Sequence, residues 1–245
     1  MQIAPRIWIV GSGQLGLSNA IDCHVYLVGG GGAYFLVDAG VGFEPERIVA
    51  RVEQAGAKAK EIRGILITHA HSDHAGGARA LSEALGTEVF ACEEEARQMA
   101  EGTPETLGLL AAKHSGVYPE DYEYPHHRAT VIPDGWRESR GEWSLTAIVS
   151  PGHSVGSTLY LLEADGRRDL FSGDAVLSGG KLGLLNCWGS SAEAYRRHFH
   201  RIAELNITGL YPGHHLFTHA DGQRHLDRAA EALKGVYLPD HMVPG

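Results

Sequence analysis

Short apolar runs recur along the chain, and most of them end abruptly at glycine, proline or polar residues. Runs of this kind predict short, largely buried β-strands. In the first half we expect strands over residues 6–10, 24–28, 33–37, 64–67 and 87–91. A glycine-rich turn joins the second and third of these runs, so the opening of the chain predicts an antiparallel meander.

Other segments repeat their apolar residues with the period of a helix. Ile48, Val49, Val52 and Ala55 fall on one face of a helix over residues 43–55. The same pattern predicts further helices over residues 75–85, 93–100, 190–205 and 221–234, and a weaker one over 106–113. Strands alternate with these helices, which indicates an α/β fold.

The apolar run over residues 64–67 ends in a cluster of metal-ligand side chains: His69, His71, Asp73 and His74. His69 and His71 are two positions apart, so in extended backbone their side chains point to the same side. Histidines in a loop often only form hydrogen bonds, but burying this many titratable groups without a metal is costly. Imidazole with carboxylate suits zinc, and also iron or manganese.

The second half repeats this plan of an apolar strand followed by a ligand. We expect strands over residues 145–149, 158–162, 169–171 and 208–211. His153, Asp174 and His214 each follow one of these runs after a Pro-Gly or Ser-Gly pair. Such turns direct a side chain toward the ends of the strands, where ligands of α/β sheets bind. The sequence therefore predicts that several loops supply one metal site.

Composition excludes some classes of function. The chain has 245 residues and a formal net charge of −9, which argues against a general nucleic-acid-binding protein. Cys23, Cys92 and Cys187 are too few and too far apart for a disulfide framework, which suits a reducing, cytoplasmic compartment. We expect neither a signal peptide nor a membrane helix, because no stretch approaches the ~18 apolar residues that a span needs. A small-molecule substrate is the expected partner, and the oligomeric state cannot be read from the pattern.

The pattern weakens between about residues 101 and 136. Residues 118–127 of this insert are aromatic and rich in proline, which indicates a lid or a substrate-pocket segment. His126 and His127 follow a proline and no strand end, so we expect them not to bind metal. The glycines of residues 11–16 match a dinucleotide-binding motif only in their letters, because no strand–helix–strand unit surrounds them, and we expect no nucleotide cofactor.

Residues 68–77, with the sequence THAHSDHAGG, resemble the signature of the metallo-β-lactamase-fold metallo-hydrolase superfamily, especially its glyoxalase II-like and lactonase-like branches. The resemblance implies a four-layered αββα sandwich. It also implies that residues 1–245 form a single metallo-hydrolase domain.

By position, the resemblance assigns three residues to each of two divalent metal ions and one residue to both. The first ion is held by His69, His71 and His153, the second by Asp73, His74 and His214, and the bridging ligand is Asp174. Asp38, which follows the third strand, supports the histidine ligands from outside this set. Zinc is the expected metal, with iron or manganese as alternatives. The implied activity is hydrolysis of a small ester, thioester or lactone by a hydroxide between the ions, with Asp73 carrying protons.

Details of the ligand motifs narrow the choice among the branches of this superfamily. β-Lactamases of this superfamily lack the bridging aspartate, so Asp174 speaks against that activity. Glyoxalase II carries an additional helical domain after its last ligand, and residues 215–245 are too few for one. Many acyl-homoserine lactonases have a tyrosine three residues after the bridging aspartate, where this chain has Leu177. An ester or thioester is therefore favoured over a lactone.

Two other hypotheses remain open from the sequence. The first is a mononuclear iron persulfide dioxygenase of the same fold, which would use His69, His153 and Asp174. The second is a non-catalytic metal-binding scaffold. The complete set of seven ligands favours two ions over one, and a purely structural site needs fewer ligands.

Overall fold

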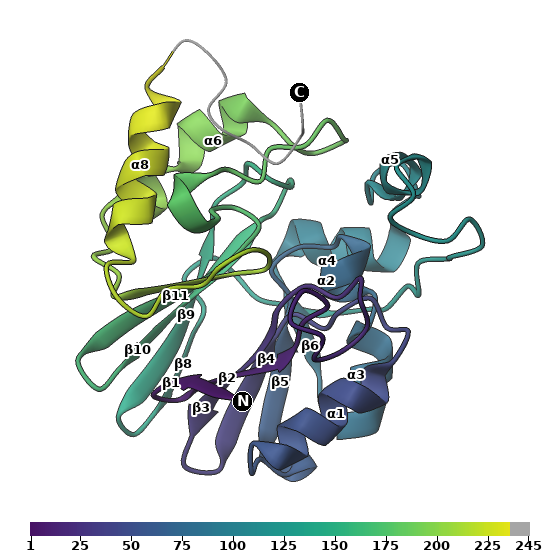
Figure 1. Cartoon of the computed structure of the whole chain (residues 1–245), viewed down its shortest axis with the longest axis vertical. Coiled ribbons are helices and arrows are strands. Elements are labelled where there is room, and N and C mark those ends of the chain that lie inside the picture. Colours follow the sequence, from purple (N-terminus) through teal and green to yellow (C-terminus); the bar gives the residue numbers. More distant parts are fainter. Residues whose placement is uncertain (236–245) are drawn as a thin grey trace. The chain divides into compact units, whose positions relative to one another are not determined.

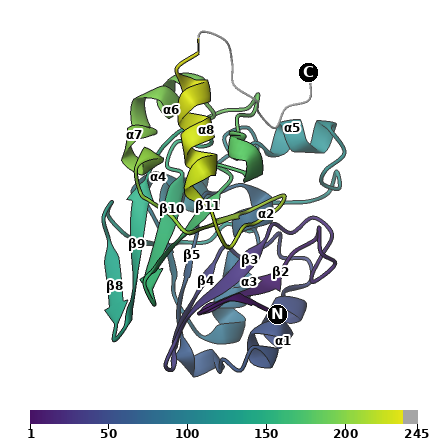
Figure 2. The same cartoon turned by 60° about the vertical axis from the view of Figure 1, so that its left-hand side comes forward.

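The computed structural model describes residues 1–235 and divides the chain into two compact units, Met1–Ile132 and Pro133–Gly245. Each unit contains one β-sheet with helices (Figures 1 and 2). The final ten residues of the expected 1–245 domain lie outside the described residues. That these units act as one domain stays a prediction.

The sheet of the first unit follows chain order from edge to edge. Its strands are β1 (Gln2–Ala4), β2 (Ile7–Gly11), β3 (Val25–Gly30), β4 (Ala33–Val37), β5 (Ile62–Leu66), β6 (Val89–Ala91) and β7 (Thr130–Val131). β1 to β4 pair antiparallel, which confirms the predicted meander. β4 to β7 pair parallel, so their carboxyl ends meet at one edge of the sheet.

Helices connect the parallel strands of this sheet. They are α1 (Pro45–Gln54), the 3₁₀ turn η1 (Ala59–Glu61), α2 (Ser72–Ala75), α3 (Ala78–Leu85), α4 (Glu93–Glu101) and α5 (Leu109–His114). Ile48 and Val52 of α1 are buried in the same apolar core as Leu36 and Ile65 of the sheet. The apolar face predicted for a helix over residues 43–55 is therefore the face that α1 buries.

The sheet of the second unit has the spatial order β12-β11-β10-β9-β8. Its strands are β8 (Arg137–Arg140), β9 (Trp143–Val149), β10 (Thr158–Ala164), β11 (Arg167–Gly173) and β12 (Gly209–Pro212). β8 to β11 pair antiparallel, and β11 pairs parallel with β12. As a result β9, β11 and β12 all run in the same direction.

Helices of the second unit include α8, which packs against the 3₁₀ turn that follows β11. The helical elements are η2 (Ser178–Gly180), α6 (Ala192–His198), α7 (His200–Ala203) and α8 (Gln223–Leu233). In place of the single helix predicted over residues 190–205 there are two helices, α6 and α7, which meet at Phe199. Ser191 caps the first of them, and its side chain accepts a hydrogen bond from the Ala194 amide.

The chain is thus mixed α/β with two sheets, as the sequence predicted. The strands that the pattern did not reveal are β1, β7 and β8, whose side chains are mostly exposed or half-buried and form no apolar run. Among residues 1–235, no helix has the length and apolar character needed to cross a membrane.

Candidate metal centre

The first unit supplies four of the predicted ligands from the loop after β5. β4 and β5 are parallel neighbours, and Val37 pairs with Leu66. This register places Asp38, the next residue after β4, beside Thr68 at the same edge of the sheet. Two polar side chains from adjacent strand ends therefore meet directly below the ligand loop.

Asp38 is the organising residue of this loop. The Thr68 amide donates to Asp38 Oδ1 at 2.8 Å, and the Thr68 hydroxyl donates to Oδ2 at 2.9 Å. His74 Nδ1 donates to the same Oδ2 at 2.8 Å, and His69 Nδ1 lies 3.0 Å from the Thr68 hydroxyl. Since the proton of that hydroxyl goes to Asp38, its oxygen accepts from His69. Both histidines are therefore held as the tautomer that presents the Nε2 lone pair to a metal.

The rings and the carboxylate of the loop gather in one place. The centroid of the His69 ring lies 4.6 Å from that of His71 and 4.0 Å from that of His74. Asp73 Oδ2 lies 3.7 Å from His74 Nε2. The structure thus brings together the four ligands that the sequence predicted for this unit.

Glu95 fixes the backbone of the loop. Its carboxylate is almost fully buried at the start of α4 and accepts a hydrogen bond of 2.7 Å from the Ala70 amide, between His69 and His71. The sequence pattern did not reveal Glu95 as part of the site. Its one signal is a glutamate within the first turn of a predicted helix, a position that exposed acidic residues also favour.

Tyr118 is the second residue of this site that the sequence did not reveal. Its hydroxyl donates to Asp73 Oδ1 at 3.0 Å. Burial and the negative charge of Asp73 raise the pKa of Tyr118 well above its ordinary value, so the phenol keeps its proton. The aromatic insert therefore contacts the ligand loop directly.

Cys23, Asp38 and His74 also lie close enough together to suggest a metal cluster. Asp38, however, already accepts hydrogen bonds from Thr68 and His74. The Cys23 thiol in turn donates to the His24 carbonyl at 3.6 Å. The hydrogen bonds of this group therefore support the ligand loop.

A cavity of about 330 Å³ in the first unit lies between the loop after β4 and the aromatic insert. Val41, Phe43 and Tyr122 give it apolar walls, and Asp121 and Glu123 contribute acidic groups. The Tyr122 hydroxyl donates to the Val41 carbonyl at 3.3 Å, which joins the two walls. This supports the expectation that the insert forms part of a pocket.

The second unit supplies three predicted ligands from three strand ends. His153 follows β9, Asp174 follows β11 and His214 follows β12. These strands run in the same direction, so their carboxyl ends share one edge of the sheet. The Gly213 amide donates to the Gly173 carbonyl at 2.8 Å, which holds the last two ligand loops side by side.

One carboxylate oxygen is the centre of this second group. Asp174 Oδ2 lies 3.9 Å from His153 Nε2 and 3.7 Å from His214 Nε2. His153 Nδ1 donates a short hydrogen bond to the Gly183 carbonyl, which leaves the Nε2 lone pair directed at the carboxylate. Asp174 and His153 are buried, and His214 is half-buried.

Gly183 is required by the close approach of backbone to ligands. A Cβ atom at this position would lie 1.9 Å from the Asp174 carbonyl and 2.8 Å from His153 Nδ1. No other residue could place its carbonyl against the His153 ring in this way. A glycine between two predicted ligands in the chain was the available signal.

The spacing of donor atoms fits divalent metal ions. Two ligand atoms that bind one tetrahedral zinc at ~2.1 Å lie about 3.4 Å apart. The pairs Asp73–His74, His153–Asp174 and His214–Asp174 have donor separations of 3.7 to 3.9 Å. These separations are too long for hydrogen bonds and close to what a shared ion requires. Imidazole nitrogen with carboxylate oxygen is a donor set that suits zinc, and also iron and manganese.

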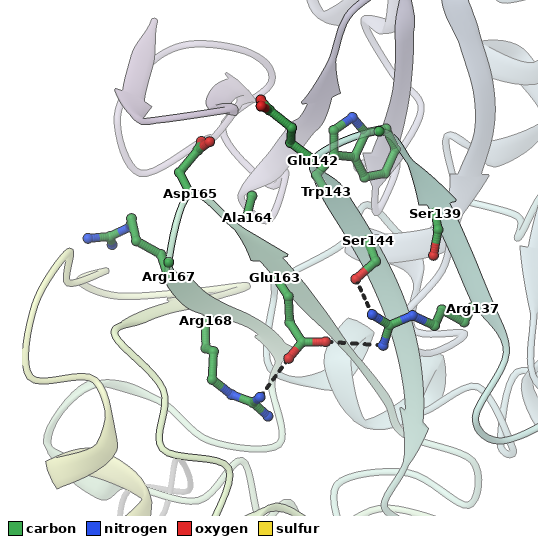
Figure 3. Close-up of a pocket in the computed structure, with 12 residues that line it drawn as sticks. Arg137, Ser139, Glu142, Trp143, Ser144, Glu163, Ala164, Asp165, Arg167 and Arg168 are labelled. Carbon is green, nitrogen blue, oxygen red and sulfur yellow. Dashed lines mark hydrogen bonds and ion pairs between the residues drawn. The ribbon is translucent and has the colours of Figure 1, made fainter.

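A larger groove in the second unit is not part of this arrangement. It has a volume of about 560 Å³ and lies at the opposite ends of β9, β10 and β11 from the ligands (Figure 3). Glu163 accepts hydrogen bonds from both Arg137 and Arg168, and the three arginines in its lining are matched by three acidic residues. The groove therefore carries no net charge that would select an anionic ligand.

The chain is similar in sequence to a family of known proteins. The family model described as the metallo-beta-lactamase superfamily matches residues 19–214. The chain is 28% identical over 214 residues to an atrochrysone carboxyl ACP thioesterase of Aspergillus fumigatus, covering 86% of this chain and 56% of that protein. It is 29% identical over 164 residues to a hydroxyacylglutathione hydrolase of Methylobacillus flagellatus, covering 66% of this chain and 52% of that protein. The chain thus spans about half the length of both relatives.

Among solved structures, the chain resembles a metallo-beta-lactamase from Cronobacter sakazakii with a TM-score of 0.73. The likeness covers 96% of this chain and 94% of that one, at 24% sequence identity. At this level of identity the likeness shows a shared fold and says nothing about a shared substrate.

Proposed function

Because the chain belongs to the metallo-β-lactamase superfamily, we propose that it is a metal-dependent hydrolase with two divalent ions, most favourably zinc. In this proposal the ligand group of the first unit and that of the second unit act on the same pair of ions. His69, His71 and His153 hold one ion. The other ion is held by Asp73, His74 and His214, and Asp174 binds both.

The observation that carries the proposal is the arrangement around Asp174. One buried carboxylate oxygen has a histidine Nε2 within 4 Å on each of two separate loops. A bridging carboxylate needs a neighbouring ligand from each ion, and the proposal assigns these two histidines to different ions, His153 to the first and His214 to the second. The preset tautomers of His69, His74 and His153 support the same conclusion, because all three direct Nε2 toward a metal.

Two bound ions would lower the pKa of a water between them and polarise the carbonyl group of a substrate. The residues of the chain supply the rest of the chemistry. Asp38 and Gly183 hold the imidazoles in place, so the site needs little reorganisation during the reaction. Asp73 would carry a proton from the attacking water to the leaving group through Oδ1, whose second lone pair stays available beside the Tyr118 hydroxyl.

We propose a thioester or ester with a small acyl group as the substrate. Two relatives are named for reactions on acyl groups, one as an acyl-carrier thioesterase and one as a hydroxyacylglutathione hydrolase. The cavity of about 330 Å³ between the loop after β4 and the aromatic insert, with walls of Val41, Phe43 and Tyr122, fits an apolar acyl moiety of modest size.

The first test is elemental analysis of wild type and of Asp174→Ala, followed by assay on a panel of thioesters, esters and lactones. We expect two equivalents of divalent metal per wild-type chain, and loss of both together with all hydrolysis in the variant. The reason is that removing the shared ligand leaves each ion short of a charged donor.

Three outcomes would contradict the proposal. Full activity of Asp174→Ala would show that this residue bridges no ions. One iron per wild-type chain, together with oxygen uptake on a persulfide, would show a dioxygenase of the same fold. Metal binding without hydrolysis of any thioester, ester or lactone in the panel would show a non-catalytic scaffold.

A further inference from the structure

Tyr118 gives the two oxygens of the Asp73 carboxylate different partners. Tyr118 lies in the connection between α5 and β7, 45 positions from Asp73 in the sequence, and its side chain is 7% exposed. Its hydroxyl donates to Oδ1 of Asp73 at 3.0 Å. Oδ2, the other oxygen, is the one that lies 3.7 Å from His74 Nε2.

The phenol ring is held firmly in this position. It stacks on the ring of Tyr122 with centroids 5.2 Å apart and an angle of 18° between planes. Tyr122 is itself fixed, since its hydroxyl donates to the Val41 carbonyl and its ring meets Phe43 edge to face at 5.3 Å. Both tyrosines belong to the apolar core of the first unit. The hydroxyl of Tyr118 is therefore a preset donor and needs no rearrangement to reach Asp73.

We propose that Tyr118 is a positioning residue for the metal ion that Asp73 and His74 hold, an inference that rests on the function proposed above. The hydrogen bond to Oδ1 stops the carboxylate from rotating and leaves Oδ2 as the single oxygen that faces the ion. A carboxylate that bound through both oxygens would fill two coordination positions. Binding through one oxygen keeps a position open for water or substrate, which a catalytic ion requires.

The insert over residues 101–136 thereby gains a defined role. It ties the substrate cavity, which Tyr122 lines, to a metal ligand through the stacked pair of rings. Neither residue is recognisable as part of a metal site from the sequence, because the contact joins positions far apart in the chain.

The test is Tyr118→Phe, which removes only the hydroxyl and keeps the stacked ring. Apo protein is titrated with zinc against a chromogenic chelator, so the readout is metal affinity and not turnover. We expect the affinity for one of the two ions to fall by about 10–100-fold, the usual effect of removing a partner of a metal ligand. The affinity for the other ion should stay unchanged.

A neighbouring tyrosine provides a matched control. Tyr124→Phe removes a buried hydroxyl that has no hydrogen-bond partner among the described residues. This variant should bind two ions with wild-type affinity. In an Asp73→Ala background, Tyr118→Phe should have no further effect, because the two residues act through one contact.

The outcomes separate this inference from the proposed function. If wild type binds fewer than two ions, the dinuclear function fails whatever the variant does. If wild type binds two and Tyr118→Phe titrates like wild type, the positioning role is wrong and the function stands. Equal weakening of both ions, with a lower urea midpoint of the apo protein, would show a purely structural tyrosine and would also overturn the inference.

Discussion

Asp38 shows how one residue can set the chemistry of several others. It accepts three hydrogen bonds, two from Thr68 and one from His74, and through Thr68 it also orients His69. The sequence predicted Asp38 as a supporting group from its place at a strand end. The Thr68 link could not be predicted, since it depends on the register between β4 and β5.

Removing this carboxylate should weaken metal binding without removing a ligand. In Asp38→Ala the buried Thr68 amide and the His74 ring lose their acceptor, so we expect about a 10–100-fold loss of metal affinity by chelator competition. Asp169→Asn is the control, because Asp169 is equally buried but bonds Arg167 in the second unit. Asp169→Asn should lower the free energy of unfolding and leave metal affinity unchanged. If Asp38→Ala keeps wild-type metal affinity, or if Asp169→Asn loses as much, then Asp38 does not support the metal ligands.

At the scale of elements, apolar strands were predictable because burial on a sheet leaves a strong pattern in the sequence. The ligands were predictable for the same reason, as each directly follows such a strand. β1, β7 and β8 have mostly exposed or half-buried side chains and left no pattern. The break at Phe199 was missed as well, since α6 and α7 continue one apolar period across it. Contacts made by Glu95 and Tyr118 join distant positions, and no local pattern encodes them.

The packing of α8 on the turn after β11 predicts a dependence of stability on pH. His225 of α8 is 4% exposed, and its Nδ1 accepts a hydrogen bond of 2.9 Å from the Gly179 amide, which requires the neutral ring. Burial, followed by the charges of Arg224 and Arg228, lowers the pKa of His225. The unfolded chain thus binds a proton more readily than the folded one, so this contribution to stability is complete above the ordinary pKa of about 6.5 and is lost as the pH falls below it.

This dependence can be isolated with His225→Asn, whose Oδ1 can accept the same hydrogen bond but does not titrate. With a chelator present, the urea midpoint of wild type should fall between about pH 7 and pH 5 more steeply than that of the variant. Parallel curves for the two proteins would mean that His225 does not gain a proton on unfolding.

At the scale of the whole molecule, the seven predicted ligands are divided between two compact units, four in one and three in the other. Each unit orders its own ligands through its own sheet edge. Neither group alone provides the three ligands per ion that a catalytic dinuclear site requires. The proposed dinuclear site therefore requires residues from both units to bind the same ions.

The most direct test compares the metal content of His71→Ala, His153→Ala and the double variant, with His126→Ala as the control. His71 lies in the first unit and His153 in the second, whereas His126 is exposed and bonds the Met99 carbonyl. If the two ligands share an ion, each single variant retains one equivalent of metal per chain and the double variant also retains one. The account predicts this result, and a double variant that loses two equivalents while each single variant loses one would contradict it.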